Sequence, residues 1–152
     1  MSDTPWLLTA HLRHDRAQPG EFRLIDPAGS PVLVGACLGK ADGQQAAKVG
    51  NPSRNPVRPY GDTPLGRYAP ARLTTFQPPH PRLGLYGIEL IGEAGPALAA
   101  MAERAGLWVH GGRGDGRLVP TYGCLRLLDR DMAAVARRVG GDLVRVTIAE
   151  VP

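Results

Sequence analysis

Residues 110–126 read HGGRGDGRLVPTYGCLR, and this stretch decides how the rest of the chain is interpreted. It opens on His110 and ends shortly after Cys124, one of the two cysteines in the chain. Only the thiolate of a cysteine attacks carbonyl groups efficiently, so a catalytic cysteine needs a base beside it. We expect His110 to close a short strand and the glycines after it to turn the chain back, which brings the imidazole to the thiol.

The composition is that of one soluble globular domain spanning residues 1–152. Hydrophobic residues make up 43% and charged residues 21% of the chain, which is enough for a continuous core. The net charge is +4, but the arginines are scattered and aromatic residues make up only 5%, which argues against a nucleic-acid surface. No apolar run approaches the length of a membrane span. The oligomeric state stays open.

Frequent glycines and prolines, 20 and 15 of them, favour a mainly β fold with two short helices. The helices are expected over residues 96–105 and 129–139, the second with Asp129 as its N-cap and Gly140 as its stop. Residues 39–62 are expected to form a long functional or disordered loop, and residues 77–82 a proline-rich turn. Strands are expected over residues 6–12, 21–25, 31–38, 67–73, 84–91, 107–110 and 143–148.

The residues around Cys124 suit a nucleophile, although each also has a plainer interpretation. Gly123 lets the backbone approach a substrate and turn N–H groups toward a developing oxyanion. Arg126 is two residues past Cys124, so both side chains share a face of an extended chain, where the guanidinium binds a carboxylate or holds the loop. Thr121 and Tyr122 contact substrate or simply shape the turn. A free cysteine is more often a small buried residue.

No metal or cofactor is expected. A zinc site built from His110 and Cys124 lacks the close ligand pairs that such sites use. The glycines after His110 are not followed by the sequence of a phosphate-binding loop.

Two motifs resemble the L,D-transpeptidase catalytic domain, also called the YkuD family. That family carries a His-Gly pair followed by Ser/Thr-x-Gly-Cys-hydrophobic-Arg/Asn, which is similar to His110-Gly111 and the run Thr121 to Arg126. Upstream, GDTPLGRYAP at residues 61–70 resembles the family's Thr-Pro-x-Gly-x-Tyr/Phe segment. The resemblance covers residues 6–150 and implies a β-sandwich or barrel. Tyr122 stands where many members have histidine, and the ten residues between His110 and Thr121 are a shorter span than in most members.

The resemblance implies an enzyme that acts on peptidoglycan stem peptides. Cys124 attacks a carbonyl of a stem tetrapeptide, D-alanine leaves, and an amine of a second stem takes the acyl group from the thioester. His110 serves as base and then acid, and a backbone carbonyl of Gly111 or Gly112 orients it. The N–H groups of Gly123 and Cys124 form the oxyanion hole. Substrate contacts are expected from Arg126, Tyr122, Thr121, Gly111 and His80.

Three alternatives stay open at this point. Water as acceptor gives an L,D-carboxypeptidase or a toxin-like hydrolase on the same peptides. A wall-binding module that keeps the fold without turnover is the other class, because function lies in the site and not in the fold. The implied location is the periplasm or the cell wall. The N-terminal residues 1–15 lack the pattern of an export signal, so a secreted effector is the alternative.

Overall fold

The computed structural model describes residues 4–112 and 115–152, and within them eleven strands form one open mixed sheet with three short helices. The strand order is β6-β7-β9-β10-β3-β2-β1-β11-β4-β8, and β5 pairs with β11. This confirms the prediction of a mainly β fold. The strands are β1 (Trp6–Leu12), β2 (Gly20–Ile25), β3 (Pro31–Leu38), β4 (Gly66–Tyr68), β5 (Ala71–Arg72), β6 (Thr74–His80), β7 (Gly84–Glu89), β8 (Gly92–Ala94), β9 (Trp108–His110), β10 (Leu125–Leu127) and β11 (Leu143–Glu150).

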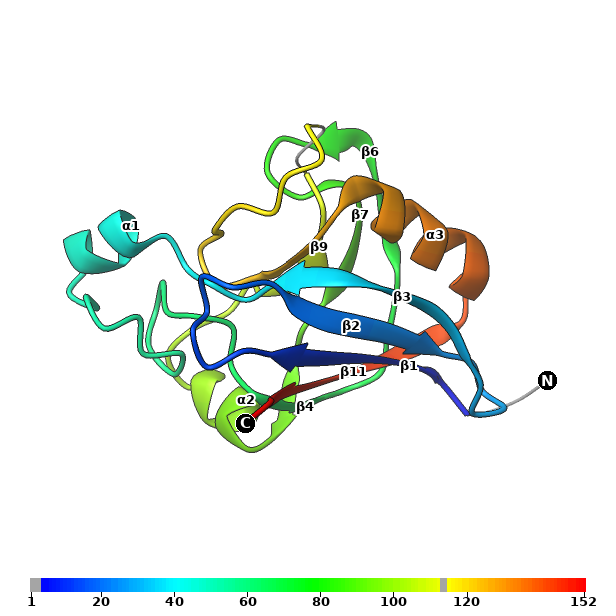
Figure 1. Cartoon of the computed structure of the whole chain (residues 1–152), viewed down its shortest axis with the longest axis horizontal. Helices are drawn as coiled ribbons and strands as arrows, with labels where there is room; N and C mark the ends of the chain where they lie inside the picture. Colours follow the sequence, from blue (N-terminus) through cyan, green and yellow to red (C-terminus); the bar gives the residue numbers. More distant parts are fainter. Residues whose placement is uncertain (1–3, 113–114) are drawn as a thin grey trace.

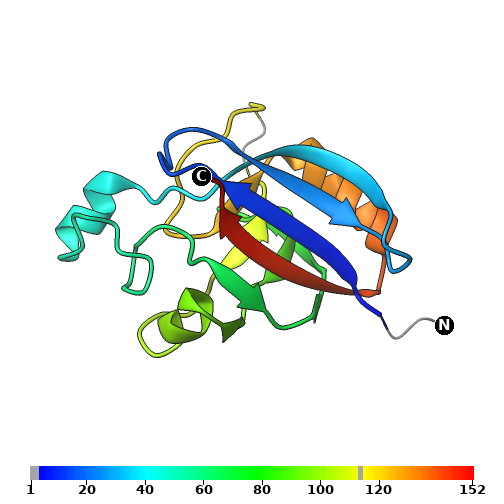
Figure 2. The ribbon, with the colours of Figure 1, turned by 60° about the horizontal axis from the view of Figure 1, so that its bottom comes forward.

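An antiparallel meander of β1, β2 and β3 forms one half of the sheet, and β11 pairs with β1 in parallel (Figure 1). Side chains alternate along these strands, so that Leu8, Ala10 and Leu12 of β1 are buried while His11 is exposed. The turn before β3 is closed by the Asp26 carboxylate, which accepts the N–H groups of Ala28 and Ser30 at 3.0 and 2.9 Å. Figure 2 shows β1 and β11 lying side by side.

On the other side of β3, the sheet continues through β10, β9, β7 and β6, and this part runs behind the meander in Figure 1. Its β9 and β10 are short, parallel and almost fully buried, as expected for strands covered on both faces. The helix α3 (Asp129–Val139) packs against β7 and β3 through an apolar stripe. The core contains Leu8, Phe22, Leu24, Ile88, Val109, Leu125, Met132 and Val135.

Helices differ from the prediction in number, length and capping. A third helix, α1 (Gly43–Lys48), lies inside the segment expected to be a loop, and the Asp42 carboxylate caps it by accepting the N–H of Gln45. The helix α2 (Pro96–Ala100) is shorter than predicted and continues only as turns. The bounds of α3 and its end at Gly140 are as predicted. Leu128, not Asp129, is its N-cap residue, because the Asp129 carboxylate instead accepts the N–H of Gly112 at 2.6 Å.

Strand predictions were wrong in two places. Of the segment expected as a proline-rich turn, residues 77–80 belong to β6, which tolerates prolines because it is the edge strand of the sheet, and only residues 81–82 lie in a turn. The strand expected over residues 67–73 is two short strands, β4 and β5, separated at Ala69 and Pro70. The strands β8 and β10 were not predicted.

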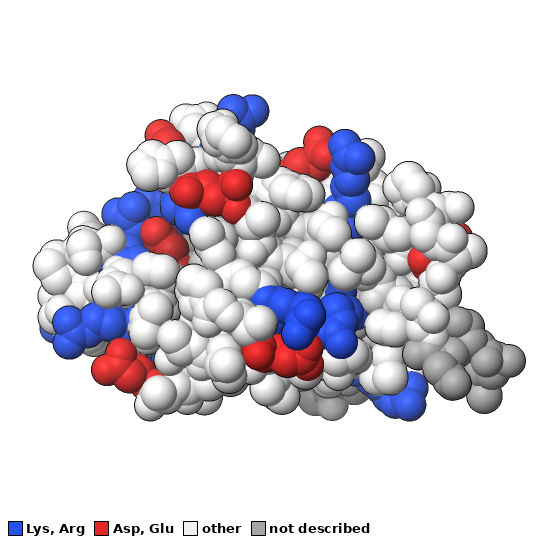
Figure 3. Space-filling model, turned by 90° about the horizontal axis from the view of Figure 1, so that it is seen from below, with Lys and Arg blue, Asp and Glu red and all other residues white. Residues whose placement is uncertain are grey.

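The charged side chains of one face are shown in Figure 3, where acidic and basic groups are interspersed and form no continuous basic surface. This distribution fits the scattered arginines of the sequence. No helix in the described ranges is long and apolar enough to cross a membrane.

Candidate active site

A cleft of about 830 Å³ contains most of the residues that the sequence singled out. Its walls come from residues 59–60, the turn between β6 and β7, the segment from residue 103 to β9, and residues 119–122. The buried side chains of His110, Cys124 and Arg126 face it. Cys124 is thus the thiol of this cleft, whereas Cys37 is fully buried in the core, where burial raises its pKa to about 12.

The register of β9 and β10 explains why these side chains meet. Arg126 lies directly opposite His110, and Cys124 is the residue just before β10. Because side chains alternate along an extended chain, Cys124 and Arg126 project to the same face, as expected from their spacing. Both line the cleft.

His110 is held as a neutral base. Its side chain is buried, and Nδ1 donates to the carbonyl oxygen of Gly111 at 2.7 Å. A carbonyl only accepts, so the proton of the neutral ring sits on Nδ1 and Nε2 keeps its lone pair. The pKa of His110 is lowered to about 4, mainly because burial disfavours the charged ring; the Gly111 contact raises the pKa in part, and the charge of Arg126 adds a smaller lowering effect.

The Gly111 carbonyl is shared between two side chains of the site. Nη1 of Arg126 donates to it at 2.6 Å, and Nε of Arg126 donates to the Val119 carbonyl at 2.9 Å. Arg126 therefore holds the loop between His110 and Cys124, the second of its two expected roles. Gly111 itself does not line the cleft; it borders an adjoining hollow beside Asp129.

The thiol of Cys124 is protonated in this environment, because burial raises its pKa. The N–H of Trp108, which donates to Sγ at 3.3 Å, opposes that effect, as do the charges of Arg104, Arg82 and Arg126. Sγ also contacts the Gly106 carbonyl at 3.9 Å. Within the described residues no hydrogen bond joins Sγ to His110. The two side chains line one cleft but do not contact each other through a hydrogen bond. Such contacts are often long before a substrate binds.

The turn before Cys124 is fixed by Thr121. Its hydroxyl donates to the Cys124 carbonyl at 2.8 Å and accepts the N–H of Gly123 at 3.0 Å. The expectation that Gly123 offers its N–H to an oxyanion is therefore not met in this conformation, and Thr121 shapes the turn. Gly123 is needed for its backbone: φ is +119°, and a Cβ there would lie 1.9 Å from Nη2 of Arg104.

Arg104 is a member of the site that the sequence did not reveal. It is buried, and Nη1 donates to the carbonyls of Pro56 and Asp62 at 2.7 and 3.4 Å. Nη2 donates to the carbonyls of Gly61 and Tyr122 at 3.3 and 3.0 Å. One guanidinium thus ties the 51–62 segment to the turn that carries Cys124. The only sequence signal was a charged residue at the end of a predicted helix.

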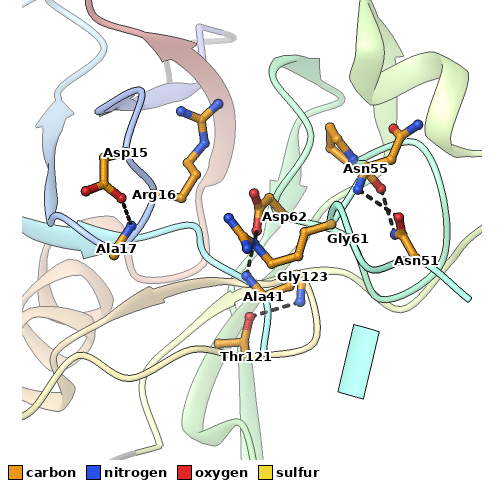
Figure 4. A network of polar contacts seen from close by, with 12 residues as sticks. Asp15, Arg16, Ala17, Ala41, Asn51, Asn55, Gly61, Asp62, Thr121 and Gly123 are labelled. Carbon is orange, nitrogen blue, oxygen red and sulfur yellow. Dashed lines mark hydrogen bonds and ion pairs between the residues drawn. The ribbon is translucent and has the colours of Figure 1, made fainter. Parts of the chain in front are cut away.

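A network of polar contacts orders the 51–62 segment (Figure 4), of which Pro59 and Tyr60 line the cleft. The Asp62 carboxylate accepts the N–H of Ala41 and Nε of Arg54 at 2.8 and 3.1 Å. The buried Asn51 side chain accepts the N–H of Asn55 at 2.9 Å and donates to the carbonyls of Asn55 and Pro59. These bonds hold Tyr60 at the cleft with a φ of +63°, an uncommon value for a residue with a side chain.

The rim of the cleft is aromatic and basic. Tyr122 is 43% exposed; its ring meets Tyr60 edge-on at 5.5 Å, and the guanidinium carbon of Arg82 lies 5.5 Å from the ring centroid. His80 also lines the cleft, and its Nδ1 accepts the N–H groups of Arg82 and Leu83, both at 3.1 Å. Tyr122 and His80, both expected from the sequence to contact a substrate, thus line the cleft. No cluster of three His, Cys, Asp or Glu side chains suited to a metal occurs among the described residues.

Comparisons with known proteins give the fold only. No family model matches the sequence, and neither does any curated protein. Among solved structures, the helical cell shape determining protein Pgp2 from Campylobacter jejuni aligns with a TM-score of 0.61 at 16% identity. Bd1075 from Bdellovibrio bacteriovorus aligns with a TM-score of 0.59 at 11% identity. The alignments cover 97% and 93% of this chain but 48% and 47% of those chains, so this chain spans about half of their length and shares their fold over that half.

Proposed function

We propose that this protein is a cysteine acyltransferase that acts on peptidoglycan stem peptides, an L,D-transpeptidase of the YkuD type. The observation that carries the proposal is a cleft that holds a thiol together with a buried, neutral imidazole whose Nε2 has no hydrogen-bond partner in the described part of the chain. The His-Gly and Thr-x-Gly-Cys-x-Arg motifs support it. The fold shared with a protein named for determining helical cell shape is consistent with a cell-wall substrate and with a place in the periplasm or cell wall.

The reaction follows from the protonation states. Nε2 of His110 accepts the thiol proton while Sγ of Cys124 bonds to the carbonyl carbon of the substrate. His110 then returns this proton to the leaving nitrogen, the C–N bond breaks, and D-alanine departs from a thioester. An incoming amine attacks the thioester, loses a proton to His110, and the thiol is regenerated. Water in place of the amine gives the free acid, which is the L,D-carboxypeptidase outcome.

Groups that do not react position the imidazole and the turn that carries Cys124. The Gly111 carbonyl orients the imidazole in the part that a carboxylate plays in other triads. Arg126 holds that carbonyl, and Thr121 with Arg104 holds the backbone on both sides of Gly123. These contacts fix the backbone that carries the proposed nucleophile and base.

Intact-mass spectrometry of the protein with a purified stem tetrapeptide, and separately with a carbapenem, tests the proposal. We expect a covalent adduct on the wild type and on Cys37→Ala, with loss of D-alanine from the peptide, and none on Cys124→Ala. Chromatography of the products separates cross-linked dimers from tripeptides and so separates transferase from hydrolase. Absence of adduct and product from folded wild type would support the wall-binding module instead.

A further inference from the structure

The cleft contains three arginines whose hydrogen bonding differs. Arg104 and Arg126 are buried and donate to backbone carbonyls. Arg82 is exposed in the turn between β6 and β7, and within residues 4–112 and 115–152 its guanidinium has no hydrogen bond or ion pair. Arg82 is therefore the arginine of the cleft whose donors remain available to a ligand. Arg126, which the sequence suggested as a carboxylate receptor, instead donates to backbone carbonyls of the loop after His110.

The position of Arg82 is set by its neighbours. Its guanidinium lies over the Tyr122 ring at a distance typical of a cation–π contact. Its backbone N–H is bound by His80, and its carbonyl packs against Gly112, where a Cβ would come within 2.2 Å of that oxygen. The turn therefore sits firmly against the loop that follows His110.

The charge of Arg82 reaches the reacting groups. Its guanidinium lines the same cleft as Cys124 and His110, and its charge lowers the pKa of both groups. In a peptide cleaved before its last residue, only one nitrogen and one Cα separate the attacked carbonyl from the terminal carboxylate. Arg82 lines the same cleft as Cys124, and a carboxylate so close to the attacked carbonyl would lie in that cleft as well. Two carboxylates, Asp42 and Glu103, also line the cleft. Neither belongs to the turn that carries Arg82: Asp42 caps α1, and Glu103 lies in the segment after α2.

We propose that Arg82, backed by the ring of Tyr122, forms a subsite for the free α-carboxylate of the residue that leaves during acylation of Cys124. The ligand class is a peptide with an unblocked C-terminal carboxylate. The proposal rests on the proposed function and deepens it. Arg82 selects peptides that end one residue beyond the attacked carbonyl.

Binding in a Cys124→Ala background tests the subsite without requiring turnover. The probes are a stem tetrapeptide ending in D-alanine and the same peptide ending in D-alanine amide, titrated by calorimetry. All other carboxylates are common to both peptides, so the affinity ratio reports the terminal group alone. We expect the acid to bind about tenfold more tightly than the amide, as for a charge-assisted hydrogen bond. Adding Arg82→Gln should bring the ratio close to one.

Two further variants complete the design. Arg82→Lys keeps the charge without the two-donor fork, so part of the preference should remain. Arg137→Gln removes an exposed arginine from the last turn of α3, outside the cleft, and should leave the ratio unchanged. Thermal unfolding of each variant verifies that the fold is retained.

The result that overturns the subsite is an acid-to-amide ratio that Arg82→Gln does not change, or a wild-type cleft that shows no carboxylate preference or no binding. Thioester formation on Cys124, measured separately by mass, keeps the two proposals apart. A thioester together with an unchanged ratio refutes the subsite and leaves acyl transfer standing. Arg82-dependent binding without a thioester refutes acyl transfer by Cys124 and leaves the carboxylate subsite standing.

Discussion

At the scale of single residues, burial sets the chemistry of His110. The imidazole is 2% exposed, and desolvation disfavours its charged form. The contact between Nδ1 and Gly111 selects the tautomer in which Nε2 is the base. The cleft therefore starts from a neutral thiol and a neutral imidazole, and the proton moves only as Sγ attacks.

The neutral state of His110 predicts how the acylation rate depends on pH on the acid side. His110 is active unprotonated, and its pKa is about 4, so kcat/KM for acylation should rise through about pH 4 and be level by pH 6. An ordinary histidine would place the midpoint near 6.5. The measurement is the rate of carbapenem acylation from pH 3.5 to 8, restricted to pH values at which the protein is folded by circular dichroism. A midpoint above 6 would contradict a buried neutral base.

Thr121 supplies a second prediction at this scale. Its hydroxyl serves both the Cys124 carbonyl and the Gly123 N–H, so Thr121→Val leaves two backbone groups of the catalytic turn without that partner. We expect acylation to slow by roughly tenfold to a hundredfold, because small misplacements of a nucleophile are costly. Thr121→Ser retains the hydroxyl and should stay within about threefold of wild type. Equal rates for the two variants would show that the hydroxyl does not position the turn.

The sequence indicated those site residues whose neighbours are close along the chain. One glycine-rich stretch of sequence contains His110, Cys124 and Arg126, and all three line the cleft. Arg104 and Arg82 were missed, because their partners lie on the segments around Pro56 and Tyr122, far away in sequence. The hydrogen bond of Gly123 was missed for another reason: spacing predicts a turn but not which acceptor takes its N–H.

At the scale of elements, the site depends on a segment without regular structure. Residues 51–62 look like an unstructured loop in sequence because their order comes from side-chain bonds of Asn51 and Asp62. The six-residue α1 beside them is too short for a helical period to stand out. The bounds of α3, with its long amphipathic pattern, were predictable for the opposite reason.

Arg104 tests whether this segment and the catalytic turn form one unit. Arg104→Gln removes a buried cation that binds four carbonyls and should lower the free energy of unfolding by about 2–4 kcal/mol. Hydrogen exchange should increase in residues 51–62 and 121–123 together. Glu103→Gln changes the neighbouring exposed residue and should alter neither. Faster exchange in only one of the two segments would show that Arg104 does not couple them.

At the scale of the whole molecule, the order of strands is what the sequence could not provide. The strand pattern of β1 and β11 was readable, but their parallel pairing joins the two ends of the chain. That pairing places β11 between β1 and β4, and it ties the meander to the strands that follow the 51–62 segment. Long-range pairing of this kind depends on which apolar faces fit together, and not on local pattern.

The cooperativity of this sheet is measurable with one pair of identical substitutions. Leu8 is fully buried on β1, beside Val146 of β11, whereas Leu98 of α2 is 53% exposed. Leu8→Ala should lower the free energy of unfolding by about 2–5 kcal/mol, because it opens a cavity where the two ends of the chain meet. Leu98→Ala should change it by less than about 0.5 kcal/mol. Urea unfolding followed by tryptophan fluorescence, which reports Trp6 on β1 and Trp108 beside Cys124, should give a single transition for both variants. Two transitions, or equal losses for the two leucines, would mean that the meander and the catalytic half of the sheet unfold separately.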